Sequence, residues 1–147
     1  MSISKGFDRN MVPKVLIIDD DHSLTEMFKL AISEQGFEVF TANSGPKGIE
    51  TMRQMQPDVI VLDLMMPDMD GWQVCREIRS FSQVPILVIS AIVDSQQVMR
   101  ALDDGADDYL VKPIVPGVLI SRLKRLVRQT YNKRKNDDLS GMSAPEG

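Results

Sequence analysis

The strongest constraint on the fold of this chain is a regular alternation between short aliphatic runs and longer segments with helical spacing of apolar residues. The runs that we predict to be strands are Val15 to Ile18, Phe37 to Ala42, Val59 to Leu62, Ile86 to Ile89 and Tyr109 to Val111. After each run, apolar side chains return every three or four residues, as they do along the buried side of a helix. Strict alternation of this kind is typical of a parallel sheet with helices on both faces. We therefore predict a doubly wound α/β domain.

The composition of the runs predicts their places in the sheet. Residues 15–18, 59–62 and 86–89 are aliphatic throughout, which is typical of parallel strands that are covered on both faces. The run from Phe37 to Ala42 contains an acidic residue, Glu38. A central strand would bury that carboxylate, so we predict that this run forms an edge of the sheet.

Size and composition exclude several classes of protein. The chain has 147 residues, of which 43% are hydrophobic and 26% charged, as in one globular domain and unlike a disordered or fibrous chain. No apolar run approaches the roughly 20 residues of a membrane-spanning helix, and Met1 to Asn10 lacks the pattern of a secretory signal. The single cysteine, Cys75, has no partner for an internal disulfide. We therefore expect a cytoplasmic protein without a membrane partner.

The charge is unevenly distributed along the chain. Residues 122–135 contain seven of the 17 bases and no acid, whereas all 21 acids lie elsewhere. An acidic body is not expected to bind nucleic acid through its general surface. The basic stretch is interpreted either as an electrostatic contact surface or as a solvated last helix that runs into a linker. We divide the chain into an N-terminal extension (1–12), a domain (13–131) and a basic, polar linker or disordered tail (132–147).

Polar side chains follow four of the predicted strands, at the point where each strand ends. Asp19 and Asp20 follow the first, Asp63 the third, Ser90 the fourth and Lys112 the fifth. Because the carboxyl ends of parallel strands form the edge where ligands bind in such folds, we expect these side chains to share one site. Helix capping is the alternative for Asp20, for Asp21 beside it and for Ser90, since Asp and Ser are favoured at helix N-termini. For Asp63 and Lys112 that alternative is weaker, because each ends a buried strand, where an unpaired charge is costly.

The chemistry of this set points to a metal ion and a phosphoryl group. The carboxylates of Asp19, Asp20 and Asp63 repel one another unless a cation lies between them. Oxygen ligands favour a hard ion, and Mg²⁺ suits few carboxylates because it keeps waters and accepts phosphate oxygens. The Lys112 ammonium and the Ser90 hydroxyl are donors to phosphoryl oxygens. A carboxylate also serves as a nucleophile, which gives an aspartyl phosphate.

Four segments carry these residues: Lys14 to Asp21, Val59 to Gly71, Leu87 to Ala91 and Gly105 to Pro113. In this order and at this spacing they resemble the receiver domain of bacterial two-component response regulators, over roughly residues 13 to 130. The resemblance implies a flavodoxin-like (βα)5 fold, a doubly wound parallel sheet with the strand order 2-1-3-4-5.

The resemblance also implies a role for each acidic residue of the site. Asp63 is implied to accept a phosphoryl group from a sensor histidine kinase or a phosphotransfer protein. Asp19, Asp20 and Asp63 are implied to hold Mg²⁺, with the backbone carbonyl of Met65 as a further ligand. Lys112 occupies the position of the family's invariant lysine.

The same resemblance implies a switch. Ser90 takes the place of the family's switch threonine or serine and completes the catalytic set with Asp63 and Lys112, while Tyr109 takes the place of its switch aromatic. After phosphorylation, Ser90 is expected to move toward the phosphoryl group and Tyr109 to turn into the vacated space. That movement repacks the face built from the fourth helix, the fifth strand and the fifth helix. The bond between Lys112 and Pro113 is implied to be cis.

The sequence says less about what such a switch controls. A phosphorylation-dependent homodimer is one hypothesis, in which Asp103 faces Lys124 of the partner and Asp108 faces Arg122. Nucleic acid would be contacted only through an effector domain that is absent from this chain. Whether the chain is a receiver alone or a fragment of a longer regulator stays open, as do its cognate kinase and pathway.

The leading interpretation is a phosphorylation-dependent signalling switch that takes part in its own phosphoryl transfer and loss, and not a metabolic enzyme. The alternative is a small Mg²⁺-dependent phosphatase of the haloacid-dehalogenase type, which also forms an aspartyl phosphate. That family needs a second aspartate two residues after its nucleophile, where this chain has Met65. A nucleotide-binding domain is a third interpretation, but no glycine-rich loop follows the first strand.

Overall fold

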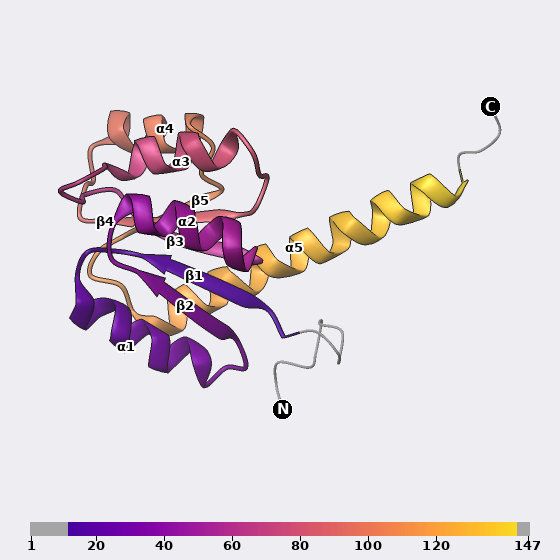
Figure 1. Ribbon diagram of the computed structural model, residues 1–147, viewed down its shortest axis with the longest axis horizontal. Coiled ribbons are helices and arrows are strands. Elements are labelled where there is room, and N and C mark those ends of the chain that lie inside the picture. Colours follow the sequence, from indigo (N-terminus) through magenta and orange to yellow (C-terminus); the bar gives the residue numbers. More distant parts are fainter. Residues whose placement is uncertain (1–11, 144–147) are drawn as a thin grey trace.

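The computed structural model describes residues 12–143, in which five strands and five helices alternate along the chain (Figure 1). Their bounds are β1 (Lys14–Ile18), α1 (His22–Ser33), β2 (Glu38–Ala42), α2 (Gly45–Met55), β3 (Val59–Asp63), α3 (Gly71–Arg79), β4 (Ile86–Ser90), α4 (Ser95–Asp103), β5 (Asp108–Val111) and α5 (Pro116–Ser143). None of the helices in this range combines the length and the apolar character that crossing a membrane requires.

The strands form one parallel sheet in the order β2-β1-β3-β4-β5. This order and the alternation of elements confirm the predicted doubly wound α/β fold. Register decides what meets at the sheet edge: Ile18 of β1 lies opposite Leu62 of β3, so Asp19 and Asp63 follow at the same level. Ser90 of β4 is opposite Val111 of β5, so Lys112 follows next to it.

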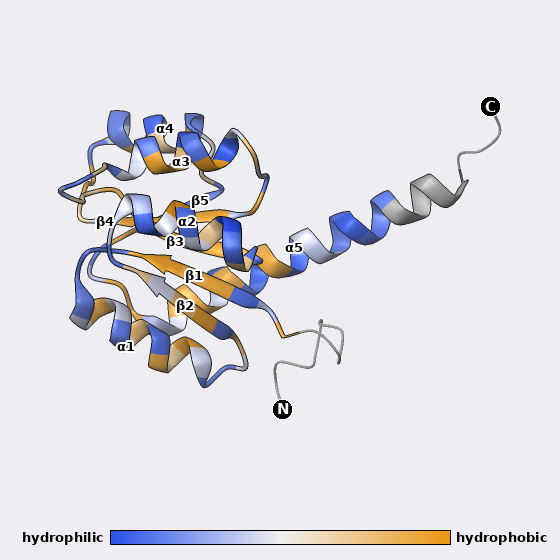
Figure 2. Cartoon of the chain, viewed as in Figure 1, coloured by the Kyte–Doolittle hydropathy of each residue, from blue (hydrophilic) through white to orange (hydrophobic). Residues whose placement is uncertain are grey.

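Both faces of the sheet are covered, and each face has its own core. Alternate residues of the strands point to opposite faces. Leu16, Ile18, Ile60 and Leu62 pack on one face with α2, α3 and Ala101 of α4. The other face joins Val15, Ile17, Val59 and Val61 to α1 and α5. Figure 2 shows the resulting hydrophobic colour of the central strands. At the β2 edge Glu38 is exposed, as predicted.

The end of α5 is helical in the part of the chain, from residue 132 onward, where we predicted a linker or a disordered tail. The helix crosses that boundary and runs to Ser143. Polarity suggested a tail, but residues 118–140 contain neither glycine nor proline, and Lys, Arg and Gln are good helix formers. Residues 132–143, here called the outer segment of α5, project beyond the sheet (Figure 1). Of the predicted N-terminal extension, only Val12 lies within the described residues, and residues 144–147 lie outside them as well.

Candidate functional site

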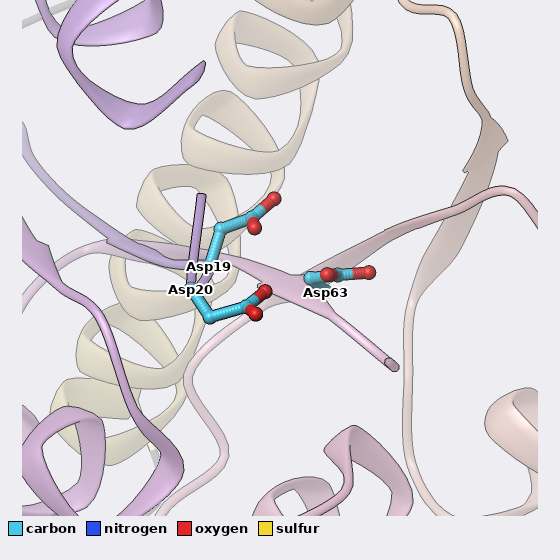
Figure 3. A group of neighbouring side chains, drawn as sticks. All are labelled: Asp19, Asp20 and Asp63. Carbon is cyan, nitrogen blue, oxygen red and sulfur yellow. The ribbon is translucent and has the colours of Figure 1, made fainter. Parts of the chain in front are cut away.

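Three carboxylates meet where β1 and β3 end. Asp19, Asp20 and Asp63 each place an oxygen within 4.8 Å of the others, and Figure 3 shows the three side chains gathered at this edge. Asp19 is 0% exposed and Asp63 4% exposed, whereas Asp20 is exposed. The cluster is therefore buried on the side of the sheet and open to solvent on the side of Asp20.

Among the described residues, one ammonium group reaches this cluster, from the position directly after β5. The Nζ of Lys112 lies 3.0 Å from Oδ2 of Asp19 and 3.6 Å from Oδ2 of Asp63. Burial alone would lower the pKa of Lys112, but the hydrogen bond with Asp19 and the charges of Asp63 and Asp19 outweigh it and raise the pKa. Lys112 is therefore a cation at neutral pH. The peptide bond between Lys112 and Pro113 is cis, the isomer that the resemblance implied.

The surroundings of Asp63 disfavour the ionised form of its carboxyl group. Burial and the charge of Asp19 raise its pKa from 3.8 to about 6, against the opposing effects of Lys112 and of the Met65 amide. That amide donates to Oδ1 of Asp63 at 3.3 Å. One ammonium does not neutralise three carboxylates, so the site favours a further cation. Its all-oxygen donor set and its open side fit a hydrated Mg²⁺ ion.

Neighbouring groups fix Asp19 in place. Its Oδ1 accepts the backbone N–H of Asp21 at 3.0 Å, and its carbonyl oxygen accepts the side-chain amide of Asn43 at 2.7 Å. Asn43 is a positioning residue that the sequence analysis missed, although it follows β2 as the other site residues follow their strands. Asp21 caps α1 by accepting from Leu24 N. Helix capping therefore accounts for Asp21, and not for Asp20.

Ser90 and Tyr109 are linked through the loop between β4 and α4. Ser90 is 0% exposed, and its Oγ accepts the backbone N–H of Ile92 at 3.1 Å. The Tyr109 hydroxyl donates to the carbonyl oxygen of the same Ile92 at 2.9 Å. The N-cap of α4 is Asp94, so Ser90 is not a helix cap. Both predicted switch residues thus contact one residue of one loop.

The pairs expected across a dimer have partners within the chain. Nη1 of Arg122 lies 2.7 Å from Oδ2 of Asp108, and Nζ of Lys124 donates to the side-chain oxygen of Gln35 at 3.2 Å. These contacts lie within one chain, so the pairing of Arg122 and Lys124 with acids of a partner stays a prediction. Asp108 begins β5 and Arg122 lies on the adjacent α5, which explains the pairing.

Comparisons with known proteins agree with this geometry. The family model described as response regulator receiver domain matches residues 15–124. The chain is 42% identical over 118 residues to transcriptional regulatory protein AfsQ1 of Streptomyces coelicolor, covering 80% of this chain and 52% of that protein. It is 38% identical over 128 residues to the DNA-binding response regulator MtrA of Mycobacterium tuberculosis, covering 87% and 54%. The chain thus spans about half the length of these curated relatives.

Solved structures give the same result. The receiver domain of the Francisella response regulator 1452 matches with a TM-score of 0.77 and 33% identity, over 80% of this chain and 98% of that one. A two-component response regulator from Clostridium difficile matches with a TM-score of 0.78 and 31% identity over the same shares. Together with the family match over most of the chain, these similarities show that the chain belongs to the response regulator receiver domain family.

Proposed function

We propose that this receiver domain accepts a phosphoryl group on Asp63, from a sensor histidine kinase or a phosphotransfer protein, and uses it as a switch. The observation that carries the proposal is the setting of Asp63. Its carboxylate is buried at the carboxyl edge of the sheet, with its pKa raised to about 6 and the Lys112 ammonium 3.6 Å away. A site of this kind holds a carboxylate ready for reaction with its charge only partly compensated.

We assign the metal ligands to Asp19, Asp20 and Asp63, with the backbone carbonyl of Met65 as a fourth. Bound Mg²⁺ would supply positive charge to the carboxylates and to phosphoryl oxygens at the site. Both carboxylate oxygens of Asp19 accept hydrogen bonds, one from Lys112 and one from the Asp21 amide. Asp20 is exposed, so its carboxylate is free to contact the ion directly.

Phosphoryl transfer at Asp63 is a simple exchange of bonds. A carboxylate oxygen attacks the phosphorus of a phosphohistidine, an O–P bond forms, the P–N bond breaks, and its electron pair returns to the imidazole nitrogen. Attack requires the ionised carboxylate, which predominates above pH 6 given the raised pKa. Lys112 is placed to pair with the phosphoryl oxygens, and the Ser90 hydroxyl is placed to donate a hydrogen bond to one of them.

The switch follows from the loop contacts. Ser90 Oγ accepts a hydrogen bond from Ile92, so its own proton remains available as a donor to a phosphoryl oxygen. Movement of Ser90 toward Asp63 would pull the loop, and Tyr109 would respond because its hydroxyl is bonded to Ile92. The affected surface is the face of α4, β5 and α5.

The remaining assignments are also proposals. The relatives are named a transcriptional regulatory protein and a DNA-binding response regulator, and we infer that nucleic acid is contacted through a part of such proteins other than this domain. We further propose that the protein acts in the cytoplasm, that phosphorylation promotes a homodimer, and that it has no metabolic activity. The alternative, a phosphatase of the haloacid-dehalogenase type, has no support among the comparisons.

The test is phosphoryl uptake from radiolabelled acetyl phosphate with Mg²⁺. The wild type should incorporate phosphate, and Asp63→Asn should incorporate none, because the amide lacks the nucleophilic carboxylate. Asp68→Asn is the matched control, since Asp68 is an exposed aspartate in the loop that follows β3. Incorporation into the Asp63→Asn variant at the rate of the wild type would overturn the assignment.

A further inference from the structure

The three carboxylates of the acidic cluster are already gathered in this structure. Asp19, Asp20 and Asp63 each bring one oxygen within 4.8 Å of the others (Figure 3). Like charges at such a separation repel one another, and the ion pairs of Lys112 are with Asp19 and Asp63. The third carboxylate, that of Asp20, therefore needs another restraint to stay in the cluster.

The side chain of Asp20 does not supply that restraint. It is exposed, and among residues 12–143 it has no hydrogen-bond or ion-pair partner. A side chain without a partner is able to exchange between its staggered rotamers. The direction of the bond between Cα and Cβ is then what the fold controls, and that direction depends on the backbone at Asp20.

Hydrogen bonds hold the peptide groups on both sides of Asp20. The carbonyl oxygen of Asp19 accepts the side-chain amide of Asn43 at 2.7 Å. The backbone N–H of Asp21 donates to Oδ1 of Asp19 at 3.0 Å. Because each peptide group is planar, fixing the groups before and after a residue fixes its φ and ψ angles. The two bonds together therefore determine where the Asp20 side chain starts.

Asn43 joins three segments of the chain at this point. It follows Ala42, the last residue of β2, whose carbonyl oxygen accepts the backbone N–H of Asp19 at 3.1 Å. Its Nδ2 also lies 3.4 Å from Oγ1 of Thr25, which is 2% exposed in the first turn of α1. The Thr25 hydroxyl in turn donates to the carbonyl oxygen of His22 at 3.0 Å. One amide thus connects the end of β2, the end of β1 and the start of α1.

We propose that Asn43 is a positioning residue for Mg²⁺, which holds the Asp19 carbonyl group so that the Asp20 carboxylate stays with the other two. The inference rests on the metal ligands assigned under the proposed function. Groups that hold the ligands of a metal in place contribute to its affinity. Asn43 lies outside the ligand set and its amide is uncharged, so its removal changes the geometry of the cluster and leaves its charge unchanged.

The experiment compares two alanine variants of neighbouring residues. Asn43→Ala removes the donor to Asp19. Ser44→Ala is the matched control, because Ser44 lies in the same loop but its Oγ accepts the backbone N–H of Lys47, at 3.2 Å, as the N-cap of α2. Urea unfolding of each protein at a series of Mg²⁺ concentrations gives the dissociation constant, since a ligand of the native state raises the free energy of unfolding as it binds.

We expect Asn43→Ala to bind Mg²⁺ about fivefold more weakly than the wild type, the loss that corresponds to one hydrogen bond. Ser44→Ala should bind Mg²⁺ as the wild type does, although it also loses stability because α2 loses its cap.

Phosphorylation by acetyl phosphate supplies a second measurement. Asn43→Ala should need about fivefold more Mg²⁺ than the wild type to reach half of its maximal rate. At saturating Mg²⁺ its rate should be close to that of the wild type, because Asp63, Lys112 and Ser90 are unchanged.

The outcomes separate this inference from the function on which it rests. Equal Mg²⁺ affinities of Asn43→Ala and the wild type overturn the role of Asn43, and so do equal losses in Asn43→Ala and Ser44→Ala, since a loosened loop would then suffice. A lower rate of Asn43→Ala at saturating Mg²⁺, with no change in the half-maximal concentration, also contradicts it. If Mg²⁺ did not stabilise the wild type, the metal assignment itself would fall, and this inference with it.

Discussion

The carboxyl edge of the sheet and the outer segment of α5 are both rich in charge, but they place it in opposite surroundings. Asp19 and Asp63 are 0% and 4% exposed, whereas Lys133 and Lys135 are exposed and the Arg134 side chain is 58% exposed. Water and salt screen the second group, so each of its charges contributes little free energy. Burial makes each charge of the first group depend on its neighbours. The basic run is the more conspicuous in the sequence, yet the buried aspartates determine the chemistry.

The largest expected effect tests the cost of burying Asp63. Its native pKa of about 6 lies above the value of 3.8 for an unfolded chain, so the native state binds the proton more tightly and loses stability as pH rises from about 4 to 6. Without Mg²⁺, Asp63→Asn should therefore be more stable than the wild type at pH 7.5 by about 3 kcal/mol. At pH 4 the difference should fall below about 1 kcal/mol.

Urea unfolding at the two pH values measures this difference. Asp137→Asn is the control, because Asp137 is an exposed aspartate of the outer segment of α5 and should change stability little at either pH. If Asp63→Asn gave no stabilisation at pH 7.5, the two regions would not differ in the way that we infer.

The next effect concerns metal binding at the acidic edge. Mg²⁺ at ten times its dissociation constant should stabilise the wild type by about 1.4 kcal/mol, because only the native state gathers the ligands. Asp20→Asn should lose most of this stabilisation, since it removes the exposed carboxylate of the cluster. Thermal unfolding with and without Mg²⁺ measures both effects. An undiminished Mg²⁺ effect in the variant would remove Asp20 from the ligand set.

The smallest effect compares two arginines of α5. The Arg122 side chain is 37% exposed and lies 2.7 Å from Asp108. Arg122→Gln should cost about 1 kcal/mol, since Arg125 also contacts Asp108 and compensates in part. Arg134, in the outer segment, is 58% exposed and lies 3.8 Å from Asp58. Arg134→Gln should cost less than about 0.5 kcal/mol. Chemical denaturation of both variants ranks the pairs. Equal losses would mean that neither the shorter distance nor the lower exposure of Arg122 strengthens its pair.

The sequence analysis was accurate where local signals decide the structure. The alternation of runs predicted the sheet because a strand and the helix after it each have a characteristic period. Asp19, Asp63 and Lys112 come together because parallel strands in register end at one edge, so position in the chain was enough to place them. The same rule pointed to Asn43, whose side chain holds the Asp19 backbone and also donates to the Thr25 hydroxyl.

Other features depend on contacts that no local pattern encodes. Trp72 and Gln97 are 25 positions apart, and nothing in the spacing of either residue indicates their hydrogen bond. The pairing of Asp108 with Arg122 inside the chain depends on how α5 lies relative to β5. No local sequence pattern indicates that arrangement. The length of α5 was underestimated because the absence of a helix-stopping residue is a weaker signal than polar composition.

The continuity of α5 has a mechanical consequence. At 1.5 Å per residue, the outer segment is about 18 Å long. It extends a helix whose first turns pack on the body through Leu119 and Leu123. A rod of that length behaves as a lever, so a tilt of about 10° at its packed base would sweep its far end through about 3 Å. A small tilt at the packed base of α5 would thus produce a larger displacement at the far end of the outer segment.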